Sequence, residues 1–288
     1  MSLHLAERSG RTTTARDARR PLVVVAASLD DFSVSDVRRL QQAHRLGDVH
    51  LRLASDELVR ARTGRPPAFP ERERSFLAGH LRYVDSVGVV RTAEAAVRPV
   101  RGRRPDIVVV DPADDDPRLE AACSSHGVAY RSIADFALSG LPEDPLPEPS
   151  PAVRRVVVTG CFDWLHSGHI QFFLDAAALG ELYVVVGSDR NVRLLKGPGH
   201  PLRSQDERRY MAQSVRAVHR AEVSTGSGWM DAEPEIARIQ PHVYVVNEDG
   251  DQPDKRAFCR AHGLDYVVLR RRPHRGLPRR TSTALRGF

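Results

Sequence analysis

Lysine, cysteine and long apolar runs are scarce in this chain of 288 residues. Only two of its 43 basic residues are lysine, Lys196 and Lys255. The three cysteines form no Cys-x-x-Cys pair, which argues against a disulfide framework or a cysteine zinc site and favours a reducing cytoplasm. No apolar run approaches the length of a membrane span, and no apolar segment near the start is typical of a secretory signal. We therefore expect a cytoplasmic protein without a membrane partner.

Positive charge is in excess: the net charge is +6 and the pI is about 9.6. An arginine-rich solvated surface accounts for this excess, and so does an anionic ligand such as a nucleotide or a nucleic acid. With 41% hydrophobic and 28% charged residues, the composition is that of a globular protein, and the length predicts two domains. Residues 1–20 are polar and arginine-rich, and we expect a disordered tail there.

The chain contains an internal repeat. Residues 23–56 align without a gap with residues 156–189, with nine identities in 34 positions. Further on, residues 105–130 match residues 241–266 with ten identities in 26 positions. Two collinear matches predict two copies of one structural unit.

Each copy shows alternating strand and helix patterns, four strands and three helices, beginning with a buried valine run. Gly47 and Gly180 end helical patterns and are expected as C-caps. The alternation predicts two tandem Rossmann-like α/β domains with doubly wound parallel sheets, the first of them degenerate. The expected boundaries are residues 21–140 for the first domain, 141–151 for a proline-rich linker and 152–288 for the second domain.

The second copy runs from its first strand directly into His166-Ser-Gly-His169. Two imidazoles three residues apart can face one side of a helical turn, at the end where free N–H groups bind phosphate. Gly168 would give a phosphate close access to the backbone. Alone, such a pair is more often a capped helix start or a metal pair, so other segments must support a phosphate site.

Two further segments fit phosphate binding. Lys196 precedes a Gly-Pro-Gly loop and could close over phosphates as a mobile charge, although an ordinary solvated lysine has the same appearance. Near the C-terminus, the hydroxyls of 281–283 could cap a helix and hold β- and γ-phosphates. The alternative for that segment is a basic tail that binds nucleic acid nonspecifically.

Asp163 and Trp229 are less specific candidates. Asp163 has a counterpart in the first copy, Asp30, and could orient a histidine, hold a metal-bound water or cap the turn. Trp229 lies on a Gly/Ser-rich segment, where it could stack on a base or cover an acceptor; packing in the core is an equal alternative.

Together these segments carry a resemblance. Residues 162–169 resemble the His-x-Gly-His nucleotidyltransferase superfamily. Residues 195–198 and 206–210 are similar to the lysine loop and the Glu-Arg-Tyr helix of the cytidylyltransferases, and 281–286 to their C-terminal Ser/Thr segment. The tandem arrangement resembles phosphoethanolamine cytidylyltransferases. Glycerol-3-phosphate cytidylyltransferases and the adenylyltransferase domains of bacterial heptose-phosphate enzymes are also similar.

The resemblance implies a Mg²⁺-dependent transfer of CMP from CTP to a small phosphate or phosphonate acceptor, with release of pyrophosphate. The alternative donor is ATP, with a sugar phosphate as acceptor. His166 and His169 would stabilise the transition state, and Lys196 would reach the phosphates. Nucleotide contacts would come from Thr159, Gly160, Cys161, Phe162, Gly168, Thr281, Ser282, Thr283 and Arg286. Acceptor or base contacts would come from Asp163, Trp229 and Arg208, and no residue is expected as a metal ligand.

The first copy has Ser33-Val34-Ser35-Asp36 where the second has its histidine motif. It has neither imidazole, and Asp36 would repel phosphate, so we expect this copy to be catalytically silent and to pack against the active one. A homodimer is also open. A competing hypothesis is a non-catalytic protein that binds nucleotides or, less expected, nucleic acid, because fold alone does not establish catalysis.

Overall fold

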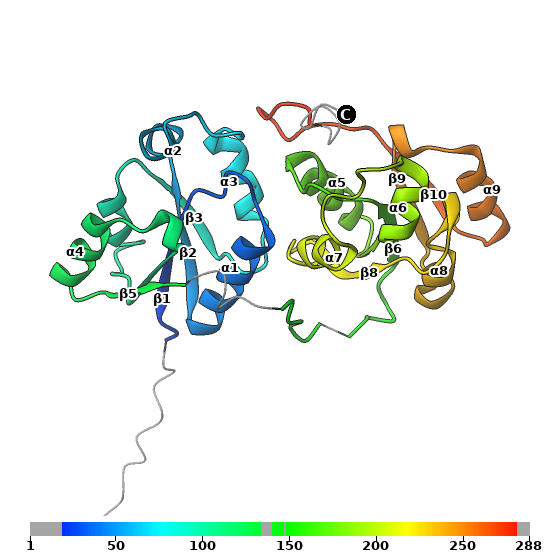
Figure 1. Ribbon diagram of the computed structural model, residues 1–288. Helices are drawn as coiled ribbons and strands as arrows, with labels where there is room; N and C mark the ends of the chain where they lie inside the picture. Colours follow the sequence, from blue (N-terminus) through cyan, green and yellow to red (C-terminus); the bar gives the residue numbers. More distant parts are fainter. Residues whose placement is uncertain (1–18, 134–139, 147, 281–288) are drawn as a thin grey trace, which may run out of the picture.

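Two parallel five-stranded sheets with the same strand order make up the computed structural model, which describes residues 19–133, 140–146 and 148–280 (Figure 1). Nearly all of the expected tail, and residues 281–283 and 286, lie outside the described residues. The orders are β3-β2-β1-β4-β5 and β8-β7-β6-β9-β10, and every neighbouring pair is parallel. The predicted fold class, a tandem pair of doubly wound parallel sheets, is therefore confirmed.

The elements of the first repeat are β1 (Leu22–Ala27), α1 (Val34–Leu46), β2 (Asp48–Ala54), α2 (Asp56–Thr63), α3 (Glu71–Gly79), β3 (Ser86–Val90), η1 (Ala93–Val97), β4 (Ile107–Val110), η2 (Pro112–Asp114), α4 (Pro117–Ser125) and β5 (Ala129–Ser132). Those of the second are β6 (Arg155–Gly160), α5 (Ser167–Ala177), β7 (Glu181–Val186), α6 (Asp189–Lys196), α7 (Gln205–Gln213), β8 (Val218–Val223), η4 (Gly228–Met230), α8 (Glu233–Ile239), β9 (Val243–Asn247), η5 (Glu248–Gly250), α9 (Pro253–Ala261) and β10 (Asp265–Leu269). The domain boundaries stay a prediction, with the sheets ending at Ser132 and resuming at Arg155.

The expectation of four strands per repeat is wrong, because each sheet has an additional strand at one edge. These strands, β3 and β8, read SVGVV and VHRAEV, with mostly half-buried side chains. A strand at a sheet edge is covered less completely than a central one, so its sequence lacks a continuous apolar run. The central strands β1 and β6 keep such runs.

Gly47 is the C-cap of α1, as expected, whereas the C-cap of α5 is Ala178 and not Gly180. Gly47 is extended, with φ of 173°, and α5 ends at Ala177, before Gly180. A Cβ atom on Gly47 would lie 2.1 Å from the carbonyl oxygen of Pro21, and one on Gly180 would lie 2.1 Å from that of Arg154. Both glycines are therefore required by a close backbone approach between the helix end and the start of the first strand of each repeat.

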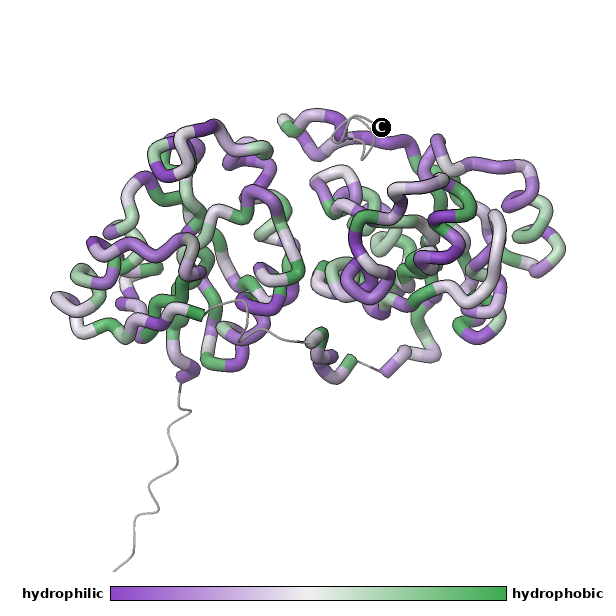
Figure 2. Tube along the Cα trace, viewed as in Figure 1, coloured by the Kyte–Doolittle hydropathy of each residue, from purple (hydrophilic) through white to green (hydrophobic). Residues whose placement is uncertain are grey.

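The helices α1 and α3 of the first repeat and α5 and α7 of the second lie between the two sheets (Figure 1). The largest apolar cluster runs through this layer and contains side chains from both repeats, and each sheet has a smaller cluster on its outer face. Figure 2 shows the apolar positions concentrated along the strands and in this inner layer. The repeats thus share one core.

Reciprocal hydrogen bonds join the repeats about a pseudo-twofold axis. Leu81 and Val215 form an antiparallel bridge. The Arg82 N–H donates to the carbonyl of Ser214, and the Arg216 N–H donates to that of His80, both at 2.8 Å. The pseudo-symmetry follows from the repeat, because equivalent surfaces face each other. Within the described ranges, no helix is both long and apolar enough to cross a membrane.

Candidate active site

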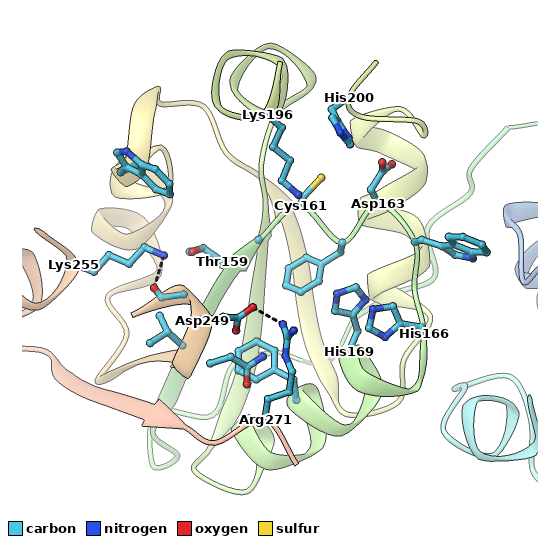
Figure 3. Close-up of a pocket in the computed structure, with 18 of the residues that line it drawn as sticks. Thr159, Cys161, Asp163, His166, His169, Lys196, His200, Asp249, Lys255 and Arg271 are labelled. Carbon is cyan, nitrogen blue, oxygen red and sulfur yellow. Dashed lines mark hydrogen bonds and ion pairs between the residues drawn. The ribbon is translucent and has the colours of Figure 1, made fainter. Parts of the chain in front are cut away.

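A cavity of about 720 Å³ opens at the carboxyl ends of the strands of the second sheet (Figure 3). Its walls come from the segment after β6, the start of α5, the end of α6, η4, the segment after β9 and Arg271. Ligands of doubly wound sheets bind at this edge, where the crossover direction changes beside the first strand. The repeat topology therefore places the cavity where a nucleotide would bind.

His166 and His169 lie together on one wall of this cavity. His166 is the N-cap of α5, and its Nδ1 accepts a hydrogen bond from the Gly168 N–H at 3.1 Å. The two imidazole rings stack, with centroids 3.9 Å apart and planes 17° from parallel. Phe162, at φ of 51°, packs edge-on against His169 with centroids 5.3 Å apart. The capped helix start and the histidine pair are thus the same structure rather than alternatives.

Both imidazoles are neutral at pH 7. Burial, followed by the positive charges of Arg271 and Arg280, lowers the pKa of His166 to about 3. Burial, followed by His166 and Arg271, holds the pKa of His169 well below its ordinary value. The Nδ1 atom of His169 is buried and has no hydrogen-bond partner among the described residues. An anion entering the cavity would raise both pKa values, and the Nδ1 atom of His169 would be available to it.

Gly168 is close-packed rather than open to a ligand. A Cβ atom here would lie 3.0 Å from the His166 ring and 3.3 Å from the carbonyl oxygen of Arg280. Gly160 is similar, because its Cβ would meet the Phe162 ring at 2.8 Å. These glycines let side chains and chain segments pack around the site, which differs from the expected access of phosphate to the Gly168 backbone.

Three cationic side chains line the cavity besides the histidines: Lys196, Lys255 and Arg271. Lys196 ends α6, and Lys255 is nearly buried in α9, where its Nζ donates to the Gly250 carbonyl at 3.3 Å. In Figure 3, Lys255 lies on the opposite side of the cavity from the histidine pair. Arg271 pairs with Asp249 at 2.7 Å. Three positively charged side chains therefore line the cavity in addition to the neutral histidine pair.

Lys255 and Arg271 were not among the residues predicted for the site. The signal for Lys255 was present, since both lysines of a lysine-poor chain line one cavity. Burial is the main cause that lowers the pKa of Lys255, and nearby carboxylates oppose it. Arg271 was visible only as one member of a basic run, and only the fold distinguishes it from Arg270 and Arg272.

Asp163 and Arg208 serve the scaffold of the site. The Asp163 carboxylate accepts the N–H groups of Leu202 and Arg203 at 2.9 to 3.0 Å, although the residue also borders the cavity. Asp30 in the first repeat accepts the N–H groups of Ala68 and Phe69 in the same way. The role therefore does not depend on catalysis.

Arg208 does not reach the cavity, which corrects its expected contact with acceptor or base. It is fully buried and donates to Asp189 at 2.7 Å and to three main-chain carbonyls, those of Cys161, Gly187 and Arg203. Arg74 makes the corresponding bonds in the first repeat. A guanidinium with its donors used in this way fixes the loops around the strand ends.

Of the other predicted residues, Trp229, Thr159 and Cys161 also line the cavity. Trp229 is 60% exposed on η4 at the cavity edge, so it is not a core side chain. Asn191 holds this segment by two hydrogen bonds with the Gly228 backbone. Thr159 lies at the base of the cavity, with its hydroxyl 2.7 Å from that of Tyr244, and Cys161 is nearby with a thiol pKa raised by burial. Thr281, Ser282, Thr283 and Arg286 lie outside the described residues.

The described residues form no metal site of their own. Within the part of the chain that the structure describes, no group of three or more His, Cys, Asp or Glu could hold a metal ion. Mg²⁺ requires oxygen ligands in near-octahedral geometry. Of the carboxylates that border the cavity, Asp163 is engaged by backbone N–H groups and Asp249 by Arg271.

In the first repeat an ion cluster occupies the equivalent place. The alignment pairs Asp36 with His169, Arg39 with Phe172 and Asp111 with Asn247. The buried guanidinium of Arg39 pairs with Asp111 and, at 3.5 Å, with Asp36. A cation and two carboxylates from this chain thus lie where the second repeat has its histidine and cavity wall.

Comparisons with known proteins identify a family and several relatives. The model of the cytidylyltransferase-like family matches residues 157–287. The chain is 35% identical over 119 residues to an FAD synthase of Aciduliprofundum boonei, covering 40% of this chain and 76% of that protein. It is also 35% identical over 150 residues to the bifunctional protein HldE of Methylococcus capsulatus, covering 52% of this chain and 30% of HldE, so it spans less than a third of that relative.

Among solved structures, a lipopolysaccharide core biosynthesis protein from Thermoplasma volcanium matches with 24% identity and a TM-score of 0.37. The match covers 43% of this chain and 99% of that one.

Proposed function

We propose that this chain, which belongs to the cytidylyltransferase-like family of nucleotidyltransferases, transfers a nucleotidyl group from a nucleoside triphosphate to an anionic acceptor. The observation that supports this most is the cavity with two stacked neutral imidazoles at a helix N-terminus and with two lysines and an arginine in its walls. A triphosphate and an anionic acceptor would bring several negative charges into this space, where fixed cations and N–H donors have their largest effect.

In the reaction we propose, an acceptor oxygen attacks the α-phosphorus of the triphosphate while the bond to the pyrophosphate leaving group breaks. No covalent enzyme intermediate is required. The ring N–H groups of His166 and His169 would donate to oxygens that gain charge, and Lys196 would neutralise the leaving phosphates. Such a reaction needs positioning and charge neutralisation more than covalent help. Mg²⁺ would enter as the counter-ion of the triphosphate, held chiefly by phosphate oxygens.

For the donor we favour ATP over CTP, although the sequence predicts CTP as the donor and ATP as the alternative. The FAD synthase that matches is named for a product that contains an adenylyl group. Trp229 at the cavity edge could stack on either base, so stacking does not distinguish them. The acceptor we propose is a small phosphate or phosphonate. A homodimer and a cytoplasmic location remain part of the proposal.

The test is a screen for pyrophosphate release in which ATP and CTP are each crossed with polyol phosphates, sugar phosphates, phosphoethanolamine, phosphonates and FMN. We expect stoichiometric pyrophosphate and a nucleotidylated acceptor from one donor. If nucleotide binds with micromolar affinity but no combination releases pyrophosphate, a nucleotide-binding protein becomes the better description. If instead polynucleotide binds with a steep salt dependence and nucleotide does not bind, the basic surface is the functional part.

A further inference from the structure

Glu73 belongs to the first repeat, but its carboxylate accepts hydrogen bonds from residues in the second half of the chain. It belongs to α3 and is only 2% exposed. The Ser167 hydroxyl donates to its Oε1 at 2.6 Å, and the Arg280 guanidinium donates to its Oε2 at 2.9 and 3.0 Å. One carboxylate thus joins the histidine motif to the segment that precedes Thr281.

The equivalent glutamate of the second repeat has a different, local role. Glu207 is at position N3 of α7 and closes a capping box with the N-cap Ser204. In α3 the N-cap is Pro70, which makes no side-chain cap. Because proline offers no hydroxyl to complete a capping box, the carboxylate of Glu73 is available for the other repeat. The repeats therefore differ at the N-cap, where Pro70 stands in place of Ser204, and this difference lets Glu73 bind residues of the other repeat.

The groups that Glu73 holds lie next to the histidine motif that borders the candidate active site. Ser167 stands between His166 and Gly168 at the first turn of α5. The Arg280 carbonyl lies so close to Gly168 that a Cβ there would be 3.3 Å from it. Arg280 is also the last described residue before the predicted triphosphate-binding hydroxyls at 281–283. Glu73 therefore holds Arg280 beside the first turn of α5, next to the histidine motif.

Aromatic side chains surround the same contact. The Arg280 guanidinium lies over the Phe69 ring, 5.4 Å from its centroid. Phe69 in turn packs edge-on against Trp164, with centroids 5.7 Å apart and planes at 90°. A charge-assisted pair with two N–H donors is directional, and the low exposure of Glu73 limits competition from water. The contact is therefore suited to hold Arg280 in one place.

We propose that Glu73 is a positioning residue of the active site, through which the first repeat fixes the histidine motif and Arg280 relative to each other. This proposal rests on the proposed function. It gives the first repeat a part in polyphosphate binding without any contact with substrate. The group recognised by the positioned elements is the triphosphate of the donor.

The test measures the affinity of the full chain for inorganic tripolyphosphate by calorimetry, together with the KM for the donor. Glu73→Gln keeps an oxygen that can accept from Ser167 but removes the charge that holds Arg280. We expect about a 10-fold weaker affinity and a similar rise in KM, because small displacements of binding groups have large effects. Glu71→Gln removes the same charge from the same helix, away from the second repeat, and should match the unaltered chain.

Arg280→Gln provides a second variant, since the Arg280 side chain is 23% exposed and its loss should not prevent folding. We expect Arg280→Gln and the double variant to bind tripolyphosphate as weakly as Glu73→Gln, because both changes break one interaction. Unchanged affinity in folded Glu73→Gln, or additive losses in the double variant, would overturn the positioning role. A thermal melt shows whether each variant is folded.

The two proposals can fail separately. If the unaltered chain binds tripolyphosphate but releases no pyrophosphate with any donor, the proposed reaction fails, and the affinity ratio of Glu73→Gln to Glu71→Gln still decides the role of Glu73. If the reaction occurs and Glu73→Gln has the affinity and KM of the unaltered chain, only the positioning role fails.

Discussion

The two repeats have the same topology, but different side chains lie at the carboxyl ends of their strands. In the second repeat, neutral His166 and His169 border a cavity with Lys196 and Lys255. In the first, the ion cluster of Asp36, Arg39 and Asp111 takes the corresponding place. The scaffold residues differ much less, since Arg74 and Arg208 make equivalent bonds. The arginines that hold the loops are thus equivalent in the two repeats. The residues at the carboxyl ends of the strands differ, because they border a cavity in the second repeat and form an ion cluster in the first.

The largest expected difference between the repeats is in catalysis. His169→Ala should lower turnover by about 100-fold or more, since it removes a donor to charge that develops in the transition state. Asp36→Asn, at the aligned position of the first repeat, should leave turnover unchanged. Steady-state pyrophosphate release measures both. Loss of turnover in folded Asp36→Asn would show that the first repeat is not silent.

Removing the cation from the filled site should destabilise the protein without affecting turnover. Arg39→Met should lower the free energy of unfolding by about 3 kcal/mol, because two carboxylates lose a buried partner. Arg45→Met, on the same helix, removes an arginine whose side chain is 51% exposed, and should cost less than about 1 kcal/mol. Urea denaturation measures both changes. An Arg39→Met protein as stable as Arg45→Met would mean that the cluster does not support the first repeat.

The paired glycines test what the repeats share. Gly47→Ala and Gly180→Ala should each destabilise the protein by about 2 kcal/mol, because the new Cβ meets a carbonyl oxygen at 2.1 Å in both. Gly64→Ala is an instructive comparison, because its Cβ would meet no atom within 4 Å, and only its positive φ of 73° opposes the change. If the two substitutions lower the free energy of unfolding by very different amounts, the close backbone approach does not have the same role in both repeats.

A fall in pH should destabilise the protein through His166 of the second repeat and stabilise it through Asp36 of the first. The pKa of His166 falls from 6.5 to about 3 on folding, so the unfolded chain binds a proton that the folded chain does not, and stability falls as pH drops below about 6.5. Burial raises the pKa of Asp36 from 3.8 to about 6, so its contribution to stability falls as pH rises between those values.

His166→Asn keeps an N-cap acceptor and removes the titration. Between pH 7 and pH 5 the variant should therefore lose about 2 kcal/mol less of its free energy of unfolding than the unaltered chain loses. Asp36→Asn should change the pH profile in the opposite direction. The measurement is the free energy of unfolding at pH 5, 6 and 7. Parallel profiles for His166→Asn and the unaltered chain would show that His166 is not buried neutral in the folded protein.

Much of the fold was predictable because it depends on local patterns. The buried valine runs of β1 and β6 and the repeat itself indicated a tandem pair of parallel sheets. The edge strands β3 and β8 were missed because half-buried strands have no continuous apolar run. In the site, the histidine motif was evident as a sequence motif, whereas Arg208 was misassigned because the same guanidinium chemistry serves ligands and backbone carbonyls alike.

The amino-acid sequence by itself determined the tandem topology and the presence of a histidine pair at a helix start, because strand periodicity, capping and repeat identity are properties of neighbouring residues. Only the tertiary structure decided which charges meet. Lys255 and Arg271 reach the cavity, Arg39 fills its counterpart, and Glu73 contacts Ser167 and Arg280 across the repeat boundary. These contacts join residues far apart in the chain, and their partners follow from how helices pack between two sheets, which no local pattern specifies.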